Sequence, residues 1–247
     1  MRRFHSAFFT AVVLLAAVNV VFWVGLGRNK PAPASFSQLP VRIPAAAPTA
    51  PTPVTSNPLT LVTPAGRPLL VSVVGDSIAA GHYASGPDRG FRSLVLAALS
   101  ARGPVTPEDA AGTGTSPLST AVTVPSGLDL VVLELGTDDM HIASVSQFEM
   151  AYGALVAQVH ADSPKADLVC AGTWSATGGL YDAVIERDCT SVGGRYVPLQ
   201  ALYDTPAYHG PTGVSGYYGY SDGLAPNDAG HRAIAAALLG AVGLKLQ

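Results

Sequence analysis

Short apolar runs alternate with stretches of helical spacing from residue 69 to the C-terminus. Four runs rich in β-branched residues predict buried strands, at residues 69–74, 128–135, 166–171 and 196–199. Four stretches whose apolar residues recur every three or four positions predict helices, at about residues 90–102, 145–161, 181–188 and 227–242. Because strands that alternate with helices form parallel sheets covered on both faces, we expect a three-layer α/β/α sandwich with a mostly parallel sheet.

A long apolar segment stands close to the N-terminus. Arg2 and Arg3 precede an uncharged, mostly apolar run over residues 7–26. A helix of that length spans about 30 Å, the hydrocarbon thickness of a bilayer, whereas the apolar region of a secretory signal is roughly 7–15 residues. The length favours a retained transmembrane anchor. The sequence Ala32-Pro33-Ala34 keeps a cleaved signal open as the alternative, and both place the following domain outside the cytoplasm.

Residues 31–68 separate this segment from the first predicted strand. They hold half of the chain's 20 prolines and have no hydrophobic period. Proline fixes φ and lacks an N–H, so the segment favours extended, solvated conformations. We therefore expect an anchor or signal at 1–30, a Pro-rich linker at 31–68 and one folded domain at 69–247.

The composition excludes several classes of function. Of all residues 48% are hydrophobic and only 13% are charged, and the net charge is −3. No basic surface is indicated, so nucleic acid is not an expected partner. The cysteines and histidines match no zinc spacing, and no motif implies a metal or a cofactor.

Two cysteines, Cys170 and Cys189, lie in the predicted domain. In a cytosolic protein they would be free thiols. Downstream of an export segment an even pair favours a disulfide, which would close a loop of about 20 residues and contribute about 3 kcal/mol.

The first candidate for chemistry follows the first strand. The sequence Gly75-Asp76-Ser77 forms a tight turn before an expected helix, where a serine hydroxyl can be exposed and developing negative charge is favoured. A serine that only caps the helix is the alternative.

Four segments in order resemble the motifs of the SGNH (GDSL-type) hydrolases, a family of serine esterases, lipases and acyl-sugar deacetylases. They are VVGDSIAAG, AAGTGTS, VVLELGTDD and SDGLAPNDAGH, and they span about residues 69–240. The resemblance implies an SGNH-like α/β/α fold with Ser77 as nucleophile and Asp222 as the residue that orients a histidine. It also implies an oxyanion site at Asp138 and Gly114, with Gly112 as the other candidate glycine.

Two positions depart from the pattern that the resemblance implies. Asp138 stands where the family has an asparagine that donates to the oxyanion, and an ionised carboxylate has no such donor. A protonated Asp138 would still donate. Ala225 stands where the family has the histidine that takes the proton from serine, and alanine cannot act as a base.

Another histidine would have to replace that base. His231, six residues after Ala225, is the first candidate, and His141, which follows the Asp138 turn, is the second. His82 and His209 are weaker candidates. At His231 the alternative is a ring that packs or caps at the start of the last helix.

Aromatic residues near the C-terminal motifs indicate a binding surface. Residues 203–220 contain five tyrosines among glycines, which could stack on sugar rings or acyl chains, or form an ordinary surface loop. Trp174, after the third strand, is a candidate for the wall of the same pocket.

Two functions follow. The first is an exported, membrane-anchored ester hydrolase or acyltransferase of weak activity, acting on an acylated cell-envelope glycan, a lipid or a small ester, with Ser77, Asp222 and His231 as catalytic residues. The second is a catalytically degenerate protein of the same fold that binds a glycan, lipid or protein partner without turnover. The retained Ser77 and Asp222 favour the first, and Asp138 and Ala225 favour the second.

Overall fold

A five-stranded parallel sheet forms the centre of the domain in the computed structural model, which describes residues 58–109, 122–217 and 219–246. The strand order is β2-β1-β3-β4-β5, and every neighbouring pair is parallel. The bounds are β1 Leu69–Gly75, β2 Val105–Pro107, β3 Leu130–Glu134, β4 Asp167–Ala171 and β5 Arg195–Val197. The predicted mostly parallel α/β fold is confirmed, and β2 is an additional edge strand.

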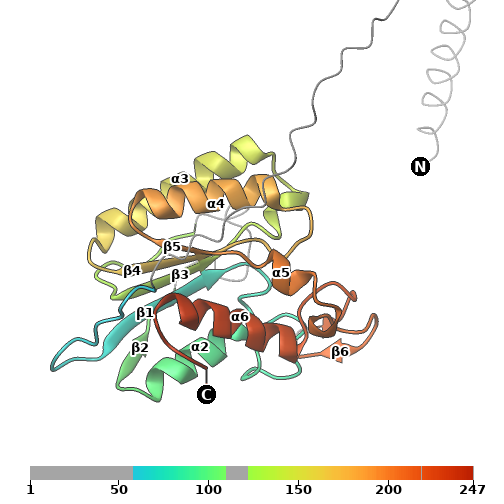
Figure 1. Cartoon of the computed structure of the whole chain (residues 1–247), viewed down its shortest axis with the longest axis horizontal. Helices are drawn as coiled ribbons and strands as arrows, with labels where there is room; N and C mark the ends of the chain where they lie inside the picture. Colours follow the sequence, from blue (N-terminus) through green and yellow to red (C-terminus); the bar gives the residue numbers. More distant parts are fainter. Residues whose placement is uncertain (1–57, 110–121, 218, 247) are drawn as a thin grey trace, which may run out of the picture. The chain divides into compact units, whose positions relative to one another are not determined.

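Two helices cover each face of the sheet (Figure 1). The helices α2 (Phe91–Ser100) and α6 (Asp228–Ala241) pack together on one face, and α3 (Val145–Asp162) and α4 (Gly179–Ser191) pack together on the other. Each face has its own core of buried aliphatic and aromatic side chains. The alternating directions of side chains along β1 and β3 supply both cores, which explains why these strands are apolar except for Ser72 and Glu134.

Several short elements lie beyond the carboxyl ends of the strands, on the side of α5 and β6 in Figure 1. They are η2 Asp139–His141, α5 Gln200–Tyr203, η3 Pro206–Tyr208, β6 Ser215–Gly216 and β7 Gly219–Tyr220. Each of these elements is too short to show a hydrophobic period, so the sequence pattern did not predict them.

The predicted disulfide is confirmed. Cys170 on β4 and Cys189 on α4 are bonded to each other, and both are fully buried. The bond ties α4 to the strand that it covers.

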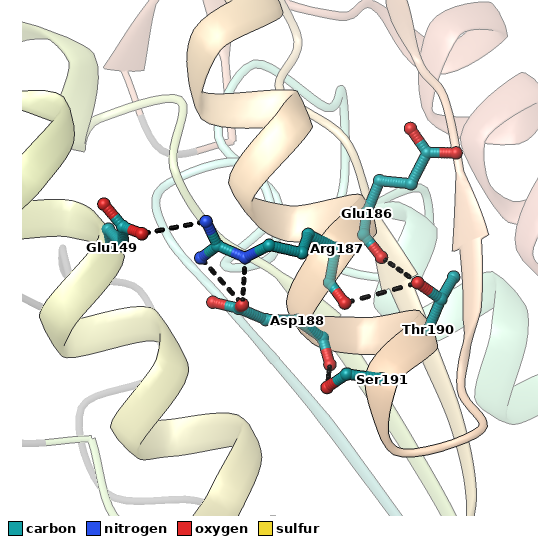
Figure 2. A network of polar contacts seen from close by, with 6 residues as sticks. All are labelled: Glu149, Glu186, Arg187, Asp188, Thr190 and Ser191. Atoms are coloured by element: carbon teal, nitrogen blue, oxygen red, sulfur yellow. Dashed lines mark hydrogen bonds and ion pairs between the residues drawn. The ribbon is translucent and has the colours of Figure 1, made fainter.

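Arg187 links α3 and α4 at the surface (Figure 2). Its guanidinium lies 2.8 Å from Glu149 Oε1 on α3 and 2.8 Å from the Oδ1 of its neighbour Asp188. Arg187 and Glu149 are each about half exposed, so the pair contributes little, about 0.2–1 kcal/mol.

The segment before β1 contacts the domain. Leu59 N donates to Ala241 O at 2.8 Å, and Leu59 and Leu61 pack against the core under α2 and α6. Part of the predicted linker therefore adheres to the domain. The predicted anchor at 1–30 lies outside the described residues, and within those residues no helix has the length and apolar character to cross a bilayer.

Candidate active site

The carboxyl ends of β1 and β3 bring two turns together. Gly75 pairs with Glu134 in the sheet, so the residues that follow each strand meet at the same edge. Any side chain at Gly75 would clash, because a Cβ there would lie 2.4 Å from Glu134 O. This close approach places Ser77 next to Asp138.

Asp138 accepts two hydrogen bonds from Ser77. The Ser77 hydroxyl donates to Asp138 Oδ1 at 3.0 Å, and the Ser77 backbone N–H donates to Asp138 Oδ2 at 3.3 Å. Asp76 holds the arrangement from below, since its Oδ2 accepts from Asp138 N at 3.1 Å and its Oδ1 from Ile78 N at 3.2 Å. The Asp138 carboxylate therefore occupies both donors of the Ser77 turn.

Asp222 lies at the same cavity and caps its own turn. Its Oδ1 accepts from the backbone N–H groups of Leu224 and Ala225, each at 2.8 Å. The Ala225 methyl group lines the cavity, and Trp174 supports this loop by donating from Nε1 to Leu224 O at 2.9 Å. The carboxylate thus binds backbone in the place where the family resemblance implies a histidine ring.

These residues line a cavity of about 400 Å³, a common size for a ligand site. Its wall contains the four motif residues Ser77, Asp138, Asp222 and Ala225. The wall also contains Thr137, Ser175, Thr177, Tyr83, Met140, His141, Trp174, Tyr203 and Leu224. Three of the five sequence-predicted site residues, Ser77, Asp138 and Asp222, therefore come together.

His231 is not in this group, which corrects the expectation that it replaces the missing base. It is fully buried in α6, and its Nδ1 accepts from Phe91 N at 3.2 Å while Nε2 lies 2.9 Å from His82 O. Both ring nitrogens are engaged by backbone, and burial lowers the pKa of His231. Its role is to fasten α6 to the start of α2 and to the turn after Ser77, as the packing alternative anticipated.

The other candidates have different positions. His141 does line the cavity, at its exposed rim. His209 packs on Trp174 and Tyr203 with ring centroids 5.6 and 4.8 Å away, and its Nε2 bonds to Tyr203 O. Gly114, with its alternative Gly112, lies outside the described residues.

Tyr83 is the site residue that sequence reasoning missed. It follows Ser77 by six positions and no motif marks it, yet it lines the same cavity as Trp174. Burial raises its pKa, and the carboxylates of Asp222 and Asp138 raise it further, so the phenol stays protonated at neutral pH. It supplies a hydrogen-bond donor beside the two carboxylates.

The sheet, the Ser77 turn and the Asp222 loop together are those of an SGNH-type hydrolase fold. A family model, the GDSL-like lipase/acylhydrolase family, matches residues 73–233. The chain belongs to this family. No curated protein sequence matches the chain.

Solved structures support the fold. A two-domain esterase active on acetylated mannans is 18% identical, with a TM-score of 0.54 over 71% of this chain and 48% of its own. The psychrotrophic esterase EstA from Pseudoalteromonas sp., inhibited by monoethylphosphonate, is 13% identical with a TM-score of 0.51, covering 70% of this chain and 96% of its own. The chain spans 63% of the length of a family two carbohydrate esterase from Clostridium thermocellum. Identities this low indicate a shared fold and no more.

Proposed function

We propose that this chain is an exported, membrane-anchored SGNH-type protein that binds an acylated cell-envelope glycan or lipid at the Ser77 cavity without efficient turnover. The observation that carries the proposal is the position of the Asp138 carboxylate, which accepts both from Ser77 N and from Ser77 Oγ.

The Asp138 carboxylate opposes ester hydrolysis electrostatically. In acyl transfer, negative charge develops on the carbonyl oxygen and is stabilised by N–H donors such as that of the nucleophile. Here that N–H is donated to a carboxylate, whose own charge repels the developing anion. The loss of one such donor costs about 10²–10³ in rate.

The lack of a general base is the second feature that opposes ester hydrolysis. Asp222 retains the position of the carboxylate that would orient a histidine, but it accepts a hydrogen bond from the Ala225 backbone N–H instead. Without a base, a serine hydroxyl is a poor nucleophile, and general-base assistance is worth about 10²–10⁴ in rate.

Export and the class of ligand rest on separate features. The apolar run at residues 7–26 and the Pro-rich linker are typical of a surface-tethered domain, and a buried disulfide is typical of oxidising compartments. The cavity is rich in hydroxyls and aromatic rings, which suits a sugar with an ester-linked acyl group. The structural neighbour active on acetylated mannans makes acetylated glycans the first class to test.

A second candidate function is ester hydrolysis with Asp138 as a direct base. It is favoured by the 3.0 Å hydrogen bond from Ser77 Oγ to Asp138 Oδ1, along which a proton could pass. In this case the substrate's carbonyl oxygen would need other donors, such as the Tyr83 hydroxyl.

Hydrolysis of a small activated acetate ester by the full-length protein in detergent distinguishes the two. We expect the natural chain to be no faster than Ser77→Ala. The double variant Asp138→Asn, Ala225→His should gain on the order of 10²-fold or more, since it supplies a donor and a base. Adding Ser77→Ala to that double variant must abolish the gain.

The opposite results would reject the proposal. A natural rate that falls in both Ser77→Ala and Asp138→Asn would establish the second function. Binding of an acetylated monosaccharide, followed by calorimetry on the natural chain, tests the ligand class, and a lack of any binding would remove the glycan from the proposal.

A further inference from the structure

Tyr83 separates the Ser77 cavity from a second one. The second cavity, again about 400 Å³, also has Tyr83 on its wall and lies against the β6–β7 hairpin and the start of α6. The two cavities also share a second piece of wall, because Ser221 lines the second cavity and its neighbour Asp222 lines the first. The two cavities are therefore adjacent along a shared wall.

The backbone at Tyr83 is strained, and the surrounding contacts hold it. Its φ of 68° lies in the left-handed region, and among the described residues it is the only non-glycine with a positive φ. Tyr217 N donates to Ala84 O at 2.7 Å, and a Cβ at Gly216 would lie 3.2 Å from Tyr83 Cα. Such strain persists only where the surroundings enforce it, so the hairpin holds the backbone of Tyr83 in place at the wall that the two cavities share.

The second cavity combines apolar faces with neutral polar groups. Pro211 and Val214 supply the apolar part, and Ser85 and Ser221 supply hydroxyl groups. Asn227 also lines the cavity, but its amide is bonded to Ala207 O, His209 O and Gly230 N at the start of α6. Two further tyrosines of the hairpin, Tyr217 and Tyr220, are 51% and 73% exposed. Apolar patches beside hydroxyl groups suit a sugar ring, because it has both a C–H face and a rim of hydroxyls.

The charge at both cavities disfavours an anionic ligand. Within the part of the chain that the structure describes, neither cavity is lined by a lysine or an arginine. The ionisable acids on their walls are Asp138 and Asp222 in the first and Asp228 in the second. Phosphate or carboxylate groups would be repelled, so an anionic lipid headgroup or an acidic polysaccharide fits poorly.

We infer that the second cavity is a sugar-binding subsite and that the ligand of this protein is an uncharged glycan chain, which runs from the Ser77 cavity across Tyr83 to the β6–β7 hairpin. This inference rests on the proposed function, since it takes the Ser77 cavity as the place of the acylated sugar. It adds that neighbouring sugars of the same chain contribute to affinity.

The test measures affinity as a function of chain length. Calorimetry on the full-length protein in detergent uses a ladder of O-acetylated, uncharged gluco-oligosaccharides from one to six sugars. We expect the hexasaccharide to bind at least about tenfold more tightly than the monosaccharide, as a few added hydrogen bonds and ring contacts would give. Replacement of the terminal hydroxymethyl groups by carboxylates should weaken the hexasaccharide.

A matched pair of variants locates the effect. Val214→Trp fills the second cavity from an exposed position, and Val62→Trp makes the same change at an exposed position outside both cavities. The readout is the ratio of hexasaccharide to monosaccharide affinity within each variant, which does not depend on the folded fraction. The ratio should fall to about one in Val214→Trp and stay at its natural value in Val62→Trp.

Three results would overturn the inference. They are equal affinity for all chain lengths, a ratio unchanged by Val214→Trp, and tighter binding of the carboxylated hexasaccharide. In each case the monosaccharide still binds and the proposed function stands. If no acetylated sugar binds at any length, the glycan is removed from the proposed function and this inference fails with it.

Discussion

Two buried carboxyl groups, Asp76 and Glu134, lie directly beneath the Ser77 turn. Burial is the main cause that raises the pKa of Asp76 to about 7, with the Asp138 carboxylate as the next. Burial also raises the pKa of Glu134 well above its usual value, followed by the charge of Asp76. Asp76 accepts two backbone hydrogen bonds that favour its ionised form, so we assign the proton of the pair to Glu134.

The retained proton makes stability depend on pH. The folded protein keeps the Glu134 proton at pH values where the unfolded chain, with a pKa of about 4.3, has lost it. The unfolded state then binds fewer protons, so the free energy of unfolding from this group decreases as pH rises above about 4. Asp76, whose pKa is raised to about 7, acts in the same direction as Glu134. His231 acts in the opposite direction, because its lowered pKa adds stability as pH rises towards about 6.5.

We therefore predict that Glu134→Gln loses less stability between pH 5 and 8 than the natural chain does. Denaturant unfolding at each pH measures it, and the difference between the two proteins removes the His231 contribution. Glu149→Gln, at a half-exposed position of α3, should keep the natural slope. Equal slopes for Glu134→Gln and the natural chain would mean that Glu134 is ionised in the folded state.

At the level of single residues, the sequence predicted which residues meet at the site better than it predicted ring directions and hydrogen bonds. Ser77, Asp138 and Asp222 could be predicted because each follows a recognisable strand or motif, and parallel strands end at one edge. The direction of the His231 ring could not, because a residue near the start of α6 faces the core or the cavity according to how the helix packs. The two hydrogen bonds between Ser77 and Asp138 also needed coordinates, since sequence alone allows Asp138 to point elsewhere.

At the level of elements, α3 has the clearest local start signal. Gln147 N donates to Ser144 Oγ at 3.3 Å, and Ser144 N donates to Gln147 Oε1 at 2.9 Å, which together form a capping box. The box satisfies two backbone N–H groups that a helix start leaves without partners. It also fixes where α3 begins next to η2, which carries His141 at the rim of the cavity.

We predict that Ser144→Ala lowers the free energy of unfolding by about 1 kcal/mol, the usual size of a lost N-cap. Ser146→Ala is the matched control, since Ser146 is an exposed residue inside the same first turn. It should be neutral or slightly stabilising because alanine has the higher helix propensity. Thermal or denaturant unfolding decides, and equal effects of the two changes would contradict a capping role.

The elements that could be predicted are those with long buried faces. The strands β1, β3 and β4 are continuous apolar runs, and the four large helices show helical spacing, so their existence follows from hydrophobic pattern. The edge strand β2 is only Val105–Pro107, half-exposed and ended by proline, so nothing in its pattern separates it from a loop. The β6–β7 hairpin has two residues in each strand and depends on contacts with the Tyr83 turn.

At the level of the molecule, the domain extends further towards the N-terminus than the expected boundary at residue 69. Leu59 and Leu61 are half-buried against the core, whereas Thr60 and Val62 are exposed. This alternation is that of an extended segment with one face on the domain. The sequence assigned this segment to the Pro-rich linker, because two leucines are too few to show a hydrophobic period.

The last prediction concerns that boundary. Removal of residues 1–57 should leave a soluble domain with the same free energy of unfolding as the form that lacks only residues 1–30. Removal of residues 1–62 should cost about 2–3 kcal/mol, because it exposes the apolar surface under two half-buried leucines and leaves Ala241 O without the Leu59 donor.

Point changes in the form without residues 1–57 separate the effect of leucine packing from the effect of chain length. The pair Leu59→Ala, Leu61→Ala should reproduce most of the loss, and the pair Thr60→Ala, Val62→Ala should not. Urea unfolding measures each form. If the form without residues 1–57 aggregates, then the N-terminal residues cover part of the domain, and if the leucine pair is silent, the contact with α6 carries no stability.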